Sequence, residues 1–528
     1  MRLTFYGGVG EIGGNQILLE DGDTRVFFDF GLPFGRRSLY FEEYLNPRPG
    51  AGLLDPLEMG LLPPLRGIYR DDLLPDESLW QRFENSPEYR RLEGVNGVLL
   101  SHAHLDHSGY ISFLRPEIPV YSSALTAFIA KAMQDSSPSN FEKEVCYASP
   151  RKLEDGYLRA QGNYIRRPFL FLDNPELTPK AQEFWDCTPM KRKPLEPSPP
   201  PPERERIGQL RLKFFPVDHS IPGACAFAVE TSAGWVVYTG DLRLKGRKGH
   251  QTEDFIHEAR KLKPSILLCE GTRAGDFRSI SEEEVYQNAL KAVRNEKELV
   301  IADFGPRNVE RLLTFYQIAR EVGRNLLILA KDAYLLQAMQ LVSPEFPPLE
   351  ELREVLIYRD LKFRLAAWEE SIHQQFQSKL ISSSEVQRNP GDFICCFSFW
   401  DLDELIDIAP RGGTYIYSSS EVFDEEGALD MKRLHNWIRH FELRGVGLPR
   451  ENLGWRVPEE EQGLHASGHA SGSELLDLVR EINPQVLLPI HTEEPEYFIR
   501  ELRGTGIEVH LPKTGEAFPR SARKEGKR

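Results

Sequence analysis

Short apolar runs recur along this chain, and several of them stop at a histidine or a carboxylate. Runs of this kind, bounded by glycine and other turn-forming residues, are typical of buried strands in an α/β protein. The polar residues that follow them are Asp29, His102, His219, Asp241, Glu270 and His491. Because α/β proteins usually build their sites from polar groups at strand ends along one rim of a sheet, we expect these positions to converge.

From residue 298 onward the pattern alternates between apolar strands and amphipathic helices. Strands are expected at 299–302, 326–329, 393–397 and 414–417, and helices around 309–316, 334–339 and 403–408. The alternation predicts a compact α/β unit, which lies in the sequence between Glu270 and the last histidine motifs.

Two stretches, 31–95 and 138–206, are rich in turn-forming and charged residues. The second holds aromatic and basic residues between Tyr157 and Trp185, which suit either packing over a site or stacking on unpaired bases. It also contains the run Pro199 to Pro202, which predicts an extended spacer.

Composition narrows the class of protein. The chain has 528 residues, 40% of them hydrophobic, which is too long for one core and sufficient for several. It has no apolar run of 18 residues, and its N-terminus leads directly into a strand and a glycine turn, so we expect neither a signal peptide nor a membrane partner. Its 6 cysteines lack metal-type CxxC spacing and indicate reduced thiols in a cytoplasmic protein.

The net charge of −15 argues against a nonspecific chromatin-type binder. It does not exclude a nuclease, because a local positive field and two divalent metals can dominate where phosphates lie.

The segment from His102 to His107 contains the strongest chemical signal. In an extended segment alternate side chains face the same way, so His102 and His104 can hold one cation while the turn lets Asp106 and His107 reach a second. A lone histidine would more often be an ordinary core or surface residue. Four ligand-type residues so close together predict a metal site, and imidazole mixed with carboxylate favours zinc or manganese.

These motifs resemble those of the metallo-β-lactamase fold. The resemblance rests on Asp29 in FFDFG, the HAHLDH segment, His219 in DHSIPG and Asp241 in YTGDL. It implies an αββα sandwich of α/β class.

Further along, Glu270, His469 in HASGHAS and His491 in LPIHTE resemble the extra motifs of the β-CASP nucleases, a branch of that fold. The glycine-rich start at 7–13 and the stretch 465–491 are similar to ribonuclease J and its relatives.

The resemblance implies two metal sites, with two Zn²⁺ as cofactors and Mn²⁺ as an alternative. The implied ligands are His102, His104 and His219 for one metal, Asp106, His107 and His491 for the other, and Asp241 as a bridge. Asp29 would orient a ligand histidine, and Glu270 would be a similar supporting carboxylate.

The implied activity is a metal-dependent ribonuclease that cleaves single-stranded RNA by a two-metal hydroxide mechanism, leaving 5′-phosphate and 3′-hydroxyl ends. Asp106 and Asp241 would act with His469, which would face the scissile phosphate and stabilise charge or protonate the leaving oxygen. Further substrate contacts are expected from Ser467 and Gly468, and from Arg307 and Asn308 at a helix start. The HASGHAS turn also suits an ordinary helix entry, since Ser471 and Ser473 with Glu474 are residues that favour capping of a helix N-terminus.

The expected domains are 1–279, the first part of the metallo-β-lactamase domain with an insertion near 138–206; 280–458, the β-CASP domain; and 459–528, the last part. The additional C-terminal domain of full-length ribonuclease J looks absent, which leaves a homo-oligomer open.

Rival functions remain at this point. A small-molecule hydrolase of the same fold would need neither a cap nor His469 and His491, and a non-catalytic subunit would lose ligands. DNA-acting β-CASP members usually carry an apolar residue where this chain has His491, so the histidine favours RNA. The choice between a 5′-exonuclease and an endonuclease, in RNA processing or decay, stays open.

Overall fold

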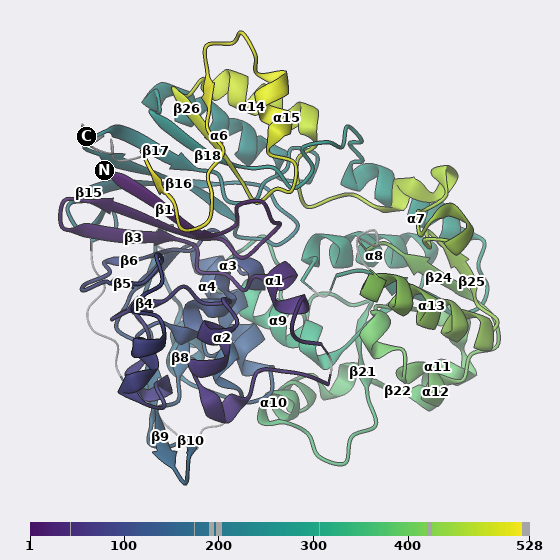
Figure 1. The fold of residues 1–528 in the computed structure, drawn as a ribbon. Coiled ribbons are helices and arrows are strands. Elements are labelled where there is room, and N and C mark those ends of the chain that lie inside the picture. The colour runs from purple at the N-terminus through teal and green to yellow at the C-terminus, as the bar shows by residue number, and fades with distance from the viewer. Residues whose placement is uncertain are drawn as a thin grey trace, which may run out of the picture.

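The computed structural model describes residues 1–42, 44–173, 175–189, 195–196, 203–305, 307–419 and 425–519. They form two lobes, with both chain ends in the same one (Figure 1). The proline run and the basic tail at 520–528 lie outside the described residues.

The first lobe, here called the sandwich, contains two seven-stranded sheets in the described part of the chain. The first has the order β12-β7-β6-β3-β2-β1-β28 and the second β14-β15-β16-β17-β18-β26-β27. Strands of the first sheet are β1 (Arg2–Gly7), β2 (Gln16–Asp21), β3 (Thr24–Phe28), β6 (Gly97–Leu99), β7 (Val120–Ser122), β12 (Phe169–Phe171) and β28 (Ala517–Phe518). Strands of the second are β14 (Arg206–Ile207), β15 (Leu210–Pro216), β16 (Cys225–Thr231), β17 (Gly234–Tyr238), β18 (Ile266–Glu270), β26 (Val486–Ile490) and β27 (Glu508–Val509).

The two sheets pack face to face over one apolar core. Phe28 of the first sheet meets Tyr238 of the second with ring centroids 5.0 Å apart. Helices cover both outer faces: α3 (Leu105–Ser108) and α4 (Ala124–Asp135) lie on one side, and α6 (Gly249–Leu262), α14 (Gly472–Ile482) and α15 (Glu496–Glu501) on the other. This layering is the αββα sandwich of the metallo-β-lactamase fold, as the motifs predicted.

The second lobe, here called the cap, is a parallel sheet covered by helices. Its order is β22-β21-β20-β23-β19-β24-β25. The strands are β19 (Val300–Asp303), β20 (Asn325–Ile328), β21 (Val355–Arg359), β22 (Leu380–Ser382), β23 (Phe393–Cys395), β24 (Thr414–Tyr417) and β25 (Arg444–Val446). The helices are α7 (Glu282–Arg294), α8 (Val309–Val322), α9 (Ala330–Gln340), α10 (Ala367–Gln375), α11 (Ser383–Arg388), α12 (Glu404–Ile408) and α13 (Glu425–His440).

The cap interrupts the second sheet of the sandwich. The chain leaves this sheet after β18 and returns as β26, which pairs with β18 in parallel so that Glu270 lies opposite Ile490. The expected α/β unit therefore stands where the sequence placed it, while the boundaries at 279 and 458 stay predictions.

The two turn-rich stretches cover the lower part of the sandwich in Figure 1. They contain α1 (Phe34–Ser38), α2 (Leu54–Glu58), β4 (Leu65–Arg66), β5 (Arg90–Arg91), β8 (Tyr147–Ala148), β9 (Arg151–Glu154), β10 (Tyr157–Ala160), β11 (Tyr164–Arg166), α5 (Pro179–Asp186) and β13 (Leu195–Glu196). Trp185 packs against Phe128 and Phe169, with centroids 5.4 and 5.3 Å away, so it belongs to the core. The alternative of packing over the site does not hold for this residue.

One buried carboxylate joins the sandwich to the cap beside this insertion. Asp135, at the end of α4, accepts hydrogen bonds from Lys131 at 2.6 Å, from Tyr147 at 2.6 Å and from Tyr334 of the cap helix α9 at 2.9 Å. These contacts fix one end of the boundary between the lobes.

Among the described residues, no helix is both long and apolar enough to span a bilayer. All 6 cysteines are free; Cys187 is exposed, in contrast to the others, which are buried as expected.

Candidate metal centre

The strand-end residues singled out in the sequence meet at one rim of the sandwich. Asp29 follows β3 directly, and His491 follows β26 directly. Both have positive φ angles, 54° and 51°, a region that non-glycine residues seldom occupy. Backbone hydrogen bonds hold them there: Asp29 N donates to Leu99 O at 3.0 Å, and His491 N to Gly8 O at 2.7 Å. The rim is thus stabilised in a strained form, as is common at functional sites.

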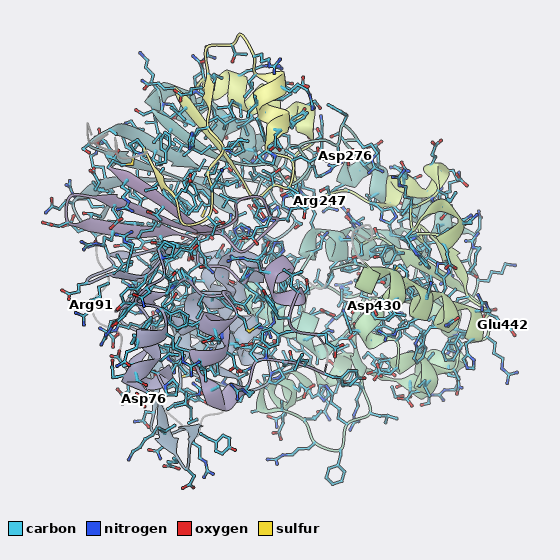
Figure 2. The ribbon with its side chains drawn as sticks, viewed as in Figure 1. Asp76, Arg91, Arg247, Asp276, Asp430 and Glu442 are labelled. Atoms are coloured by element: carbon cyan, nitrogen blue, oxygen red, sulfur yellow. The ribbon has the colours of Figure 1, made fainter. Side chains whose placement is uncertain are left out.

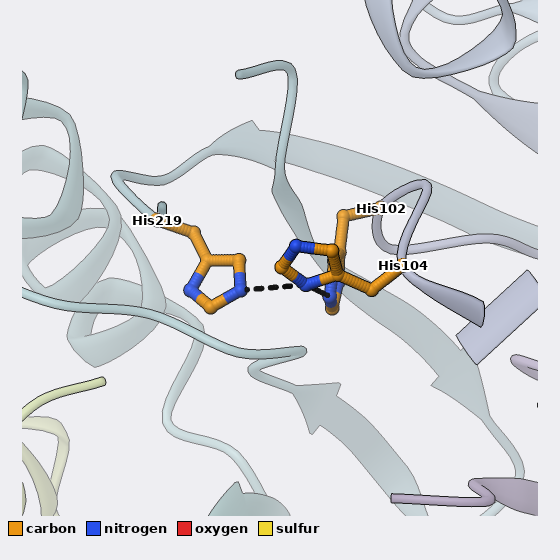
Figure 3. A group of neighbouring side chains, drawn as sticks. All are labelled: His102, His104 and His219. Carbon is orange, nitrogen blue, oxygen red and sulfur yellow. Dashed lines mark hydrogen bonds between the residues drawn. The ribbon is translucent and has the colours of Figure 1, made fainter. Parts of the chain in front are cut away.

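Three imidazoles converge in the first ligand group (Figure 3). His104 Nδ1 lies 3.1 Å from His102 Nε2 and 3.2 Å from His219 Nε2. Zinc–nitrogen bonds of about 2.0–2.1 Å in a tetrahedron would separate ligand atoms by about 3.3 Å, close to these distances. Burial lowers the pKa of His102 and His219 well below its usual range and that of His104 to about 4, which favours the neutral, metal-binding form.

The second group consists of Asp106, His107, Asp241 and His491. His491 Nε2 lies 3.3 Å from His107 Nε2 and 3.2 Å from Asp106 Oδ2. Asp241 Oδ2 lies 3.0 Å from His107 Nε2 and 3.7 Å from His102 Nε2, so this carboxylate stands between the two groups. Its other oxygen, Oδ1, is buried and has no hydrogen-bond partner among the described residues. An orphaned carboxylate oxygen beside two imidazoles and a second carboxylate fits a bound cation.

Other side chains orient the ligand histidines by contacting the ring nitrogen that faces away from the ligand group. Asp29 Oδ2 accepts from His107 Nδ1 at 2.7 Å, and Asp29 is itself held by Ser101 N and Oγ, each at 2.7 Å. Thr272 Oγ1 lies 2.8 Å from His491 Nδ1 and fixes that ring in the same way. Nothing in the local sequence singled out Thr272, because its role depends on contact with a residue 219 positions away.

His469 stands beside the ligand groups and forms a third cluster with His219 and Asp241. Its Nδ1 lies 3.0 Å from Glu270 Oε2 and 3.9 Å from Asp241 Oδ2. Burial alone would lower the pKa of His469, but the carboxylates of Glu270, Asp241 and Asp106 together outweigh it and raise the pKa to about 9. Glu270 therefore supports His469, whereas Asp29 supports a ligand histidine.

The turn before His469 faces the first ligand group. Gly468 O accepts from His219 Nδ1 at 2.5 Å, which leaves Nε2 of that ring for the ligand cluster. Ser467 Oγ accepts from His469 N at 3.1 Å. Gly468 O and Ser467 Oγ, which were expected to contact the substrate, thus each accept a hydrogen bond from another group of the protein. Beyond the turn, Ser471 and Glu474 form the capping box of α14 that the sequence predicted.

Arg307 and Asn308 stand at the start of α8. Asn308 caps this helix, since its Oδ1 accepts from Arg311 N at 3.0 Å. Arg307 lies within electrostatic range of Asp106 and His104, and its guanidinium has no hydrogen-bond partner among the residues that the structure describes. Of the two, the arginine is the one whose side chain remains free for a ligand.

Comparison with known proteins agrees with the geometry. Residues 458–512 match the Zn-dependent metallo-hydrolase RNA specificity domain. Ribonuclease J of Mycolicibacterium smegmatis is 23% identical over 505 residues, which cover 93% of this chain and 68% of that one. Ribonuclease J of Methanocaldococcus jannaschii is 21% identical, covering 98% of both chains.

A crystal structure of a protein of unknown function from Enterococcus faecalis has the same fold, with a TM-score of 0.66 and 22% identity, covering 98% of this chain and 99% of that one. The chain is a metallo-β-lactamase-fold protein that resembles ribonuclease J along nearly its whole length.

Proposed function

We propose that this protein is a metal-dependent ribonuclease that cleaves single-stranded RNA. The observation that carries the proposal is the shared carboxylate Asp241, which stands between two ligand groups and within 3.9 Å of His469. His469 and His491 both belong to the segment that matches the RNA specificity domain. This combination suits a phosphodiester substrate better than a small neutral one.

The residues present fit two divalent metals, zinc with manganese as the alternative. His102, His104 and His219 would hold one, while Asp106, His107 and His491 would hold the other, with Asp241 shared. Such metals, when bound, supply a nucleophile at neutral pH and neutralise charge on phosphate.

The chain's own residues would position the substrate and move its protons. With Nδ1 of His469 held by Glu270, Nε2 is the atom left to face the phosphate. We assign to it charge stabilisation or proton donation to the leaving 3′-oxygen. Arg307, with its free guanidinium, is assigned a phosphate contact, and Asn308 the placement of that helix start.

The mode of cleavage is tested with one RNA sequence carrying a 5′-monophosphate, a 5′-triphosphate or closed ends. We expect the 5′-monophosphate RNA to be degraded fastest and to release nucleotides from the 5′ end. Equal rates on circular and linear RNA would replace the exonuclease with an endonuclease. Faster cleavage of single-stranded DNA of the same sequence would overturn the RNA assignment.

A cytoplasmic location and a homo-oligomeric state remain predictions of this proposal, to be read from fractionation of cells and from the mass of the purified protein in solution.

A further inference from the structure

Two buried arginines, one from the sandwich and one from the cap, share the carboxylate of Glu282. Arg243, which follows β17, donates from Nη1 to Glu282 Oε1 at 3.1 Å. Arg311 of α8 donates to the same carboxylate from Nη2 at 3.0 Å and from Nε at 3.1 Å. Glu282 is the first residue of the cap helix α7 and is only 4% exposed. Glu282 therefore joins an arginine of the sandwich to an arginine of the cap at this point.

The same two arginines hold the chain segment that leads to His469. Arg243 Nη1 also donates to Ser467 O at 3.4 Å, and Arg311 Nη1 to Leu464 O at 3.3 Å. Ser418 Oγ donates to Leu464 O at 2.6 Å. The carbonyl groups of Leu464 and Ser467, at the two ends of this segment, are therefore hydrogen-bonded to the two arginines that Glu282 holds.

The positive charges of the arginines are offset by the carboxylates only while every member of the network is present. Arg243 also pairs with Glu310 and lies 3.4 Å from Asp218, so this one arginine contacts three carboxylates, Glu282 included. Arg247, labelled in Figure 2 where the sandwich meets the cap, closes the outer side by donating its backbone N–H to Glu310 at 2.8 Å. Removing one member of a buried ionic network leaves an uncompensated charge, which displaces the remaining members.

We propose that Glu282 is a positioning residue for the reaction, because it sets the place of the 464–469 segment and with it that of His469. The consequence for cleavage rests on the proposed function. Asp135, a buried carboxylate elsewhere at the lobe boundary, accepts from Tyr334 and hydrogen-bonds no residue of this segment. A contact that joins the lobes, such as that of Asp135, can therefore be removed without changing the hydrogen bonds that position the segment before His469.

The test compares Glu282→Gln with Tyr334→Phe, which removes a hydrogen bond between the lobes elsewhere. Amide exchange is followed in the metal-loaded protein at His465, His469 and Ala470, whose N–H groups bond to Gln462 O, Ser467 Oγ and Leu242 O. Glu282→Gln should speed exchange at these amides by ~10-fold or more, through local opening. Its kcat should fall by up to ~10²-fold, the scale of a displacement near 1 Å, with KM and metal content close to those of the wild type.

Tyr334→Phe should change none of these quantities. Ser418→Ala keeps every charge but removes the hydroxyl that donates to Leu464 O and accepts from Arg311 Nη1. It should speed exchange in the same segment and lower kcat less. Unchanged exchange at 464–470 in Glu282→Gln and Ser418→Ala, or equal acceleration in Tyr334→Phe, would overturn the positioning role. If Glu282→Gln does not fold, Ser418→Ala decides alone. A wild type that cleaves no RNA would overturn the proposed function, and the exchange data would still decide this inference.

Discussion

Asp241 differs from the other ligand residues because one of its carboxylate oxygens lies close to nitrogen atoms of both ligand groups. Its Oδ2 lies 3.7 Å from the Nε2 atoms of both His102 and His491, which belong to different groups. The neighbouring histidines lower the pKa of Asp241 well below its usual range, although burial opposes them. The residue therefore contributes a permanent negative charge where two cations would lie.

Replacing Asp241 by asparagine should empty both metal sites, whereas His491→Ala should empty mainly one. The reason is that asparagine keeps the shape but removes the shared charge. Metal analysis of the purified variants measures this, with Asp276→Asn as the control. Asp276, labelled in Figure 2, is a half-buried carboxylate outside the ligand groups. It pairs with Arg273 at 2.8 Å, and its replacement should leave metal content unchanged. Full metal occupancy in Asp241→Asn would contradict the shared site.

Replacing His469 by alanine should lower the rate of cleavage without weakening the binding of metal or RNA. Because Glu270 holds His469 outside the two main groups, the variant should keep its metal and its RNA affinity. Its cleavage rate should fall by about 10²–10⁴, the range for a positioned acid or base. Cleavage at the wild-type rate would exclude the role proposed here. Loss of metal would instead make His469 a ligand, since it also clusters with His219 and Asp241.

Among the secondary-structure elements, the apolar runs identified those strands whose position is determined by their own sequence. Apolar runs placed β3, β18 and β26 correctly, and therefore the positions of Asp29, Glu270 and His491 at their ends. In the cap, β19, β20, β23 and β24 appear where expected, but β21, β22 and β25 were not identified. β22 and β25 have only three residues each, and each is defined by the neighbour it pairs with. β21 has five residues, more than the cap strands that were identified, so its length does not explain why it was missed.

Contacts between distant residues could not be predicted in this way. The orientation of His219 depends on a carbonyl 249 positions away, and Glu282 finds its two arginines 39 positions before it and 29 after it. No periodicity or spacing encodes such pairs, because they exist only once the lobes have packed. The ligands themselves were visible because they gather at strand ends.

Asp303, the last residue of β19, should make the cap less stable as pH rises. Burial raises its pKa to about 7, although the Tyr415 hydroxyl donates to it at 2.6 Å. Between about pH 4 and 7 the folded chain keeps a proton that the unfolded chain releases, so stability falls with increasing pH across this window. Asp303→Asn should remove the effect and raise the free energy of unfolding at pH 8 by ~2–4 kcal/mol.

Chemical denaturation of wild type and Asp303→Asn at pH 5 and pH 8 checks this expectation. The difference between the two proteins should be larger at pH 8. A difference that is equal at both values, or larger at pH 5, would mean that Asp303 is ionised throughout this range.

Across the whole molecule, net charge opposes the proposed substrate. The chain carries −15, so attraction to a polyanion has to come from local groups. Arg307 is such a group, because it stands near Asp106 at the lobe boundary and its side chain has no partner in the described part of the chain. We expect the cap to restrict access, because a channel between the two lobes would accept a single strand more readily than a rigid duplex.

Binding of single-stranded RNA should therefore weaken steeply with salt, and duplex RNA should bind and be cut more slowly. Affinity is measured in a His469→Ala background to prevent cleavage. Each phosphate contact contributes a slope of about −0.7 in a plot of log affinity against log salt concentration, so Arg307→Gln should make the slope shallower by about 0.7. Arg91→Gln, at an exposed residue far from the cap in Figure 2, should leave the slope unchanged. An unaltered slope in Arg307→Gln would remove this residue from the phosphate path, and equal cleavage of duplex and single strand would contradict the channel.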